Sequence, residues 1–150
     1  MATVDNLTRK IIALLRRDAR MTYKEIAARL GKPESTVRDR VRRLEQTGVI
    51  KGYTVVVNRQ SIGLGTHALV MADVGYDRLD EVTRRLLEMP NVLQLYHISG
   101  EKRLAFVLAA QSLEDLQKTL AEEVADLGFK DEEVVILMKN LRELGSNLEF

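Results

Sequence analysis

Apolar residues in the first third of the chain recur at a spacing of about 3.6 residues, which predicts short amphipathic helices. Asp5 is suited to capping the first helix, which ends near residues 18–20. Thr22 and Glu25 form a capping box that starts the second helix, and Gly31 ends it. The predicted buried positions of these two helices are Leu7, Ile11, Leu14, Leu15, Ile26, Ala27 and Leu30.

A third helix is predicted from residue 34 to residue 47. Pro33 suits its first turn because the proline φ angle is already helical, whereas Lys32 is a poor N-cap. Val37, Val41 and Leu44 lie at i, i+4 and i+7, so only a narrow stripe of this helix is buried. Two helices joined by a short turn, the second exposing small polar and basic groups, predict a helix-turn-helix with its recognition helix.

The exposed face of the third helix carries the residues that we expect to contact DNA. Candidates for base edges lie at its N-terminal end: Ser35, Thr36, Arg38 and Asp39. Candidates for phosphates are Arg42, Arg43, Lys32, Tyr23 and Lys24. The alternative is a solvated charged face, but four arginines within six residues beside such a turn favour DNA. Arg40 lies nearer the buried stripe and is predicted to pair with an acidic neighbour such as Glu45, or with a phosphate.

After the third helix, the pattern changes to that of an α+β fold. Residues 53–58 alternate with β-branched character, which predicts a hinge strand, and residues 61–65 form a loop. The remaining elements are predicted at 67–76 (strand), 79–89 (helix), 92–99 and 104–110 (strands), 113–127 (helix) and 133–139 (strand). This βαββαβ order predicts a ferredoxin-like domain with both helices on one face of an antiparallel sheet.

The predicted strands are apolar on both faces, although a sheet with one wet face should alternate. The opposed sets are Ala68, Val70 and Val74 against Leu69 and Met71; Leu93 and Leu95 against Val92 and Ile98; and Leu104, Phe106 and Leu108 against Ala105 and Val107. The alternative to burying the second face is a large exposed hydrophobic patch, which soluble monomers rarely carry. A second copy of the chain is the simplest cover, so the pattern predicts a homodimer.

Composition narrows the chemistry of the 150 residues. With no cysteine and two histidines, disulfides, thiol nucleophiles and histidine-rich or thiolate metal sites are excluded. No apolar run is long enough to cross a bilayer and no secretory signal is present, which predicts a cytoplasmic protein. Residues 1–53 hold 13 Lys and Arg against 6 Asp and Glu, a net charge of +7, whereas residues 54–150 hold 10 against 16, a net charge of −6. This asymmetry predicts two domains, of which the first binds a polyanion.

The segments LTRKIIALLRRDARMTYKEIAARLG and STVRDRVRRLEQTGVIKGYTVVVN resemble the Lrp/AsnC, or feast/famine, family of prokaryotic transcriptional regulators. The likeness lies in a helix-turn-helix that runs directly into a G-V-I-x-G-Y strand, and Lys32 departs from the small polar residue usual before the proline. The resemblance implies a DNA-binding domain at 1–50, a hinge strand and linker at 51–65, and at 66–150 a ferredoxin-like (RAM) domain. In the family, that domain forms dimers, often assembled into octamers, and binds amino acids.

The resemblance also implies an effector site, for which the loop Gly100, Glu101, Lys102 and Arg103 corresponds to a family loop of sequence G-D-Y-D. Glu132 and Val134 stand where the family's last strand often carries threonines. Arg103 replaces an aspartate, and three roles are open to it: binding a ligand carboxylate, pairing with Glu101, or filling the site so that it is unresponsive. A free amino acid is therefore a candidate effector, and no other cofactor is expected.

These features predict a sequence-specific transcriptional regulator that binds double-stranded DNA at pseudo-palindromic operators as a dimer or higher oligomer. An architectural DNA-binding protein without operator preference or effector is the alternative. An enzyme built on the ferredoxin-like half is a weaker alternative. Its candidate bases are Glu101, Asp131, Glu132 and Glu133, and no spacing pairs them with a nucleophile or a metal.

Overall fold

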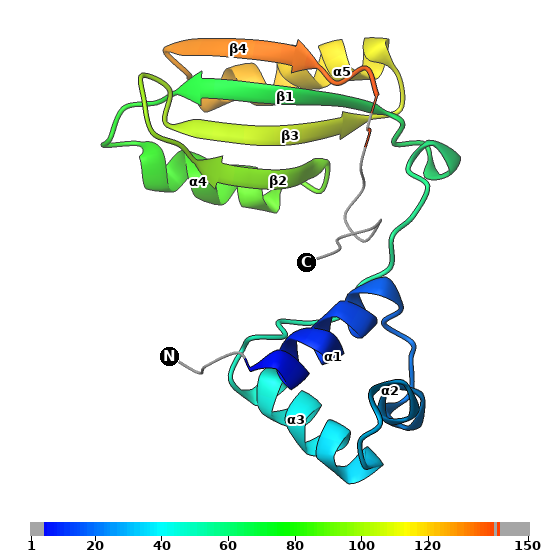
Figure 1. The fold of residues 1–150 in the computed structure, drawn as a ribbon. Helices are drawn as coiled ribbons and strands as arrows, with labels where there is room; N and C mark the ends of the chain where they lie inside the picture. Colours follow the sequence, from blue (N-terminus) through cyan, green and yellow to red (C-terminus); the bar gives the residue numbers. More distant parts are fainter. Residues whose placement is uncertain (1–4, 140, 142–150) are drawn as a thin grey trace. The chain divides into compact units, whose positions relative to one another are not determined.

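The chain forms two compact units, seen in the computed structural model, which describes residues 5–139 and Leu141 (Figure 1). The first unit is helical and extends to Val56, and the second begins at Val57 and contains the sheet. Each unit has a hydrophobic core of its own. The division falls inside the segment 51–65 that we predicted to be the linker.

The first unit consists of helices α1 (Asn6–Arg17), α2 (Tyr23–Leu30) and α3 (Glu34–Gln46). Local capping sets their ends as predicted. The Asp5 carboxylate accepts the N–H of Thr8 at 2.8 Å, and Thr22 and Glu25 form both bonds of the capping box. Gly31 ends α2 with a φ of 61°, a left-handed conformation that glycine adopts without strain.

The helix α3 starts where it was predicted, but its N-cap differs from the expected one. Pro33, rather than Lys32, is the N-cap, and the helix begins at Glu34. The φ of Pro33 is −61° and its ψ is 143°, so the residue is extended just before the first helical turn. Proline fits this position because its restricted φ suits both conformations, but it offers no side chain to cap the helix.

The core of the helical unit comes from the predicted stripes of all three helices. Its buried members are Ile11, Leu15, Ile26, Ala27, Val37 and Val41. Leu44 is buried as well, and Ile50, which follows α3, packs against this cluster. Because each helix contributes only one face, the outer face of α3 remains available to a partner.

The prediction of a hinge strand at residues 53–58 is wrong for the single chain. These residues form neither strand nor helix there. A strand needs a neighbour for its backbone hydrogen bonds, and no described segment pairs with this one. Val55 and Val56 are consequently 80% and 60% exposed. A short 3₁₀ turn, Gln60–Ile62, follows before the sheet begins.

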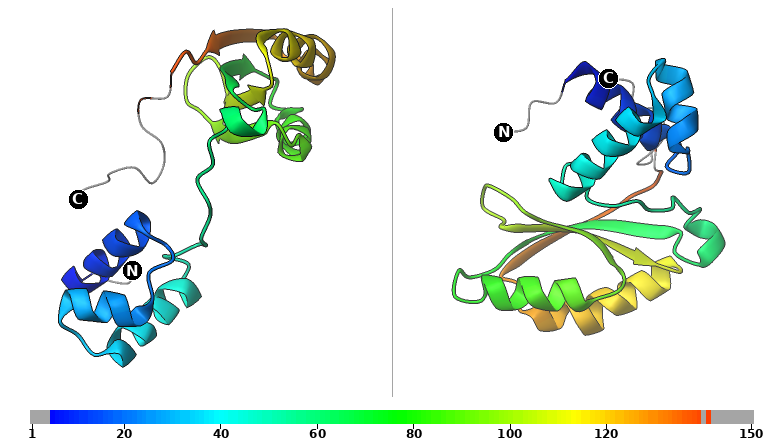
Figure 2. Two further views of the ribbon diagram at one scale, coloured as in Figure 1. Left: turned by 90° about the vertical axis from the view of Figure 1, so that its right-hand side faces the viewer. Right: turned by 90° about the horizontal axis from the view of Figure 1, so that it is seen from below.

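The second unit confirms the ferredoxin-like α+β prediction. Its elements are β1 (Thr66–Asp73), α4 (Leu79–Glu88), β2 (Val92–His97), β3 (Leu104–Ala110), α5 (Leu113–Thr119) and β4 (Asp131–Ile136). The strands pair antiparallel in the order β2-β3-β1-β4. Both helices lie on one face of the sheet (Figure 2), where they cover a core that includes Val70, Leu86, Phe106 and Leu116.

One predicted helix and three predicted strands of this unit differ from the observed elements. The helix predicted at 113–127 keeps α geometry only to Thr119; a π turn, Leu120–Val124, and a 3₁₀ turn, Ala125–Leu127, complete it before Gly128. The strand predicted at 67–76 ends at Asp73, where β4 begins opposite it at Asp131. The strands predicted at 92–99 and 133–139 are likewise shortened or shifted, because strand length follows the extent of pairing.

The sheet has apolar residues on both faces, as predicted for β1 and β3. Ala68, Val70 and Ala72 are fully buried under the helices, so the alternating residues point to the other side. We call that side the open face; its centre is Leu69, which lies in register with Val107 and Val135. In β2 the predicted alternation is wrong, because a bulge between Val92 and Gln94 lets both Val92 and Leu95 pack on the helix-covered core.

Candidate functional site

The outer face of α3 presents polar and basic side chains away from the core. Val37 and Val41 are buried, and the opposite positions are exposed. The exposed predicted contacts on this helix are Ser35, Thr36, Asp39, Arg42 and Arg43. Donors and acceptors of this kind at the N-terminal end of a helix suit base edges, and the later arginines suit phosphates.

Arg38, one of the candidates for base edges, is half-exposed and pairs with Glu34 one turn earlier. The two charged groups are 2.5 Å apart, and their side chains are 43% and 44% exposed. A solvent-exposed pair of this kind stabilises a helix by only about 0.3–0.5 kcal/mol. The guanidinium can therefore leave Glu34 at little cost, so this pair does not prevent the predicted contact with a base.

Arg40 links two helices of the first unit, but the prediction that it pairs with Glu45 is wrong. Its guanidinium donates to the Asp5 carboxylate at 2.7 Å and to the Thr8 hydroxyl at 3.2 Å, and Thr8 is buried. The backbone N–H of Thr8, followed by the Thr8 hydroxyl and Arg40, lowers the pKa of Asp5. Asp5 thus caps α1 and anchors the middle of α3, a link across 35 positions that no local pattern reveals.

The phosphate candidates at the turn differ in their surroundings. Lys24 and Lys32 are exposed, whereas Tyr23 is partly buried and packs against the helical core. Tyr23 also lines a surface hollow with Tyr53, whose hydroxyl donates to the carboxylate of Glu45 at 2.8 Å. Burial and then Glu45 raise the pKa of Tyr53 to about 12. Glu45 therefore fastens the start of the linker to the end of α3.

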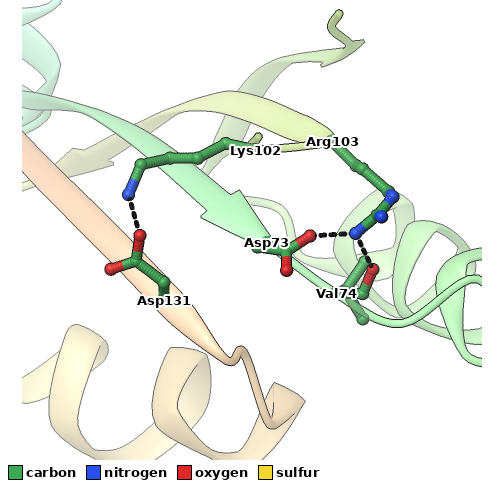
Figure 3. A network of polar contacts seen from close by, with 5 residues as sticks. All are labelled: Asp73, Val74, Lys102, Arg103 and Asp131. Carbon is green, nitrogen blue, oxygen red and sulfur yellow. Dashed lines mark hydrogen bonds and ion pairs between the residues drawn. The ribbon is translucent and has the colours of Figure 1, made fainter. Parts of the chain in front are cut away.

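The predicted effector residues gather where β1 ends and β3 and β4 begin. Lys102 and Arg103 point in different directions there (Figure 3). The Nζ of Lys102 donates to the Asp131 carboxylate at 2.7 Å, and one Nη of Arg103 donates to the Asp73 carboxylate and, at 3.0 Å, to the Val74 carbonyl. We call Asp73, Val74, Lys102, Arg103 and Asp131 together the ligand corner.

Arg103 does not pair with Glu101, which was one of the roles predicted for it. Its acidic partner is Asp73, and its guanidinium also lies 4.1 Å from the centre of the Tyr76 ring. Contact with Tyr76, together with the Asp73 charge, raises the pKa of Arg103. Both basic side chains of the loop are thus already engaged by the protein.

The remaining predicted effector residues frame the ligand corner. Glu101 is exposed, and Gly100 turns the loop with a φ of 115°, which side-chain-bearing residues rarely adopt. Glu132 and Val134 lie in β4 opposite Ala72 and Val70 of β1. The hydrogen bond to Asp131 raises the pKa of Lys102. A ligand with charged groups would have to exchange with these internal ion pairs.

Both halves of the chain match known families. Residues 4–51 match a family of winged helix-turn-helix DNA-binding domains, and residues 67–146 match the Lrp/AsnC ligand binding domain. The chain belongs to the Lrp/AsnC family. It is therefore a DNA-binding transcriptional regulator of that type, which confirms the resemblance seen in the sequence.

Relatives from archaea extend the match over most of the chain. LrpA, a transcriptional regulator of Pyrococcus horikoshii, is 33% identical over 83% of this chain and 88% of its own length. The regulator FL11 of Pyrococcus furiosus is 28% identical over 93% of both proteins. Both are named as helix-turn-helix regulators, in agreement with the exposed face of α3.

Solved structures share the fold. Escherichia coli AsnC superposes with a TM-score of 0.85 at 23% identity, covering 93% of this chain and 95% of its own. A Neisseria meningitidis transcriptional regulator in complex with L-Met superposes with a TM-score of 0.89 at 19% identity, covering 95% of this chain and 94% of its own.

None of the helices in the described part of the chain combines the length and the apolar character that a membrane span requires.

Proposed function

We propose that this chain is a cytoplasmic regulator that binds pseudo-palindromic operators as a dimer or higher oligomer, with one α3 helix in each of two successive major grooves. The observation that carries this proposal is the exposed polar and basic face of α3 above its buried apolar stripe. Two copies related by a two-fold axis would contact half-sites about 10 base pairs apart, or a multiple of that distance. The chain acts by binding, in keeping with a family of transcriptional regulators.

Selection of duplexes from a random pool tests this function directly. We expect enrichment of an inverted repeat. If about four basic groups per half-site contact phosphates, the plot of log K against log salt has a slope near −7. Enrichment of no sequence, with affinity still falling steeply with salt, would identify an architectural DNA-binding protein instead. An affinity independent of salt would exclude DNA binding through this face.

The open face supplies the surface for a homodimer. Leu69, Met71 and Val107 are only partly buried there, and Val135 on the neighbouring strand is 40% exposed. A second copy turned by two-fold symmetry would cover this area with the same residues. Gel filtration at low concentration should therefore give a species of at least twice the 17.0 kDa chain, and a monomer peak would contradict the proposal.

An amino acid is the effector class that we propose for the ligand corner, with Gly100, Glu101, Lys102, Arg103, Glu132 and Val134 as candidate contacts. The match to a ligand binding domain supports this role, as does the L-Met bound to a protein of the same fold. Calorimetric titration with the common amino acids should give heat for a binder, with loss of that heat in Arg103→Gln. No heat for any of them would leave a regulator without an amino-acid effector.

A further inference from the structure

A second strongly basic surface lies on α1, away from the proposed recognition face. Four basic residues of this helix are exposed, in two rows seven residues apart: Arg9 with Arg16, and Lys10 with Arg17. Between Asn6 and Arg17 the helix contains no acidic residue. Within the described parts of the chain, Arg9, Lys10 and Arg17 take part in no ion pair. We call these four residues the α1 basic stripe.

Helix stability explains only half of the stripe. Arg16 and Arg17 lie in the last turn of α1, where cations interact favourably with the helix dipole. Arg9 and Lys10 lie in the second turn, far from the C-terminal end, so the helix dipole does not account for basic residues there. The acidic residue one turn from Arg9 is the N-cap Asp5, whose carboxylate is already bonded to Thr8 and Arg40, and none lies one turn from Lys10. A partner outside the helix is therefore the better explanation for Arg9 and Lys10.

The stripe and the recognition face point in different directions. Ile11 and Leu15 on α1 and Val37 and Val41 on α3 are buried in the same core. Because each helix turns its apolar side toward that core, each turns its exposed side away from it. The exposed faces of α3 and α1 are therefore different surfaces of the helical unit, and the stripe is available to a polyanion other than the duplex along α3.

We propose that the α1 basic stripe binds the phosphate backbone of a second DNA segment while α3 holds the operator. The two rows are each about 10.5 Å long, since seven helical residues advance by that distance. Double-stranded DNA carries one negative charge per about 1.7 Å of axis, so a stripe of this length meets several phosphates at once. The stripe offers charge without base-reading groups, so this contact is independent of sequence.

An acidic surface on another copy of the chain is the competing partner. Residues after α5 expose Glu122, Glu123 and Asp126, but Lys118 lies 4.0 Å from Glu122 and partly offsets their charge. DNA has a denser and uninterrupted line of charge, which matches a stripe with no acidic interruption. The proposed role of the α1 basic stripe rests on the proposed operator binding by α3. The experiment below distinguishes a failure of the first from a failure of the second.

The experiment uses two labelled duplexes and the full-length protein. A donor-labelled operator, taken from the random-pool selection, is added until every α3 helix is occupied. An acceptor-labelled duplex of random sequence is then titrated in, and energy transfer reports a ternary complex. We expect the wild-type protein to form this complex and Arg9→Gln/Lys10→Gln/Arg17→Gln to bind the second duplex at least tenfold more weakly. The salt slope of the second binding step should fall by about 2.7 for each protomer that touches that duplex.

A matched variant controls for net charge. Arg84, Lys130 and Lys139 are exposed in the sheet unit, and their replacement by glutamine removes the same charge without changing α1. This control should form the ternary complex as the wild type does. Equal ternary binding by the α1 variant, or none by the wild type, would overturn the proposal. A change in the elution volume of the DNA-free α1 variant would also overturn it, by showing that the stripe joins copies of the chain. If the wild-type protein failed to bind the operator, that result would instead contradict the proposed role of α3.

Discussion

Arg38→Ala should remove the preference for one base pair in each half-site, at a cost of about 1–3 kcal/mol, or roughly 5- to 150-fold per half-site. The guanidinium lies near the N-terminal end of α3 and is held only by its exposed pair with Glu34. Its loss should not unfold the helix, because that pair is a weak surface contact. Competition binding with the enriched operator and its single-base variants measures the effect.

Lys24→Ala is the matched control for this prediction. Lys24 is exposed in the first turn of α2 and is a candidate phosphate contact. Its replacement should weaken binding to all sequences alike and reduce the salt slope by about 1 for each phosphate that the lysine no longer neutralises. If Arg38→Ala gave the same uniform weakening, Arg38 would be a phosphate contact, and the assignment of base readout to it would be wrong.

Leu69→Glu should dissociate the proposed homodimer. Leu69 lies at the centre of the open face between Val107 and Val135. Two-fold symmetry would bury the new carboxylate twice without a partner, which costs about 3–5 kcal/mol for each unpaired charge. The variant should elute as a monomer and bind the operator at least about 100-fold more weakly, because a monomer can occupy only one half-site.

Leu87→Glu is the control for the same chemical change. Leu87 lies on α4, on the helix-covered side of the sheet, and is already 71% exposed. A charge there stays in water, so neither the elution volume nor operator binding should change. Circular dichroism should show folded protein for both variants. An unchanged oligomer for Leu69→Glu would mean that copies of the chain associate through another surface.

Features that depend on neighbours in sequence could be predicted well. The caps at Asp5, Thr22 and Gly31 depend on residues within one helical turn, and the structure shows each of them. The buried stripes of the three helices also follow from periodicity, and the ferredoxin-like sheet follows from the order of helices and strands along the chain. The basic face of the third helix predicted DNA binding, and the family resemblance added the Lrp/AsnC type of regulator, which the comparisons show.

Features that depend on contacts across the fold could not be predicted. The partners of Arg40 and Arg103 lie 35 and 30 positions away, whereas the sequence pattern indicates only nearby acids such as Glu45 and Glu101. The bulge in β2 shifts register by one residue, which reverses faces without leaving a mark in the hydrophobic pattern. The apolar residues at 53–58 have the composition of a strand, but composition cannot supply the second strand that pairing needs.

The anchoring of α3 and its proposed contacts with DNA depend on different residues. The bond between Asp5 and Arg40 belongs to the anchoring. Arg40 ties the middle of α3 to the start of α1, while the residues on the outer face of α3 are the ones that we propose to contact bases. Substitutions at Ser35, Thr36 or Asp39 can therefore give the regulator a new target without altering how the helix enters the groove. A change at Arg40 would instead remove the bond between α3 and α1 and leave the Asp5 carboxylate without this partner.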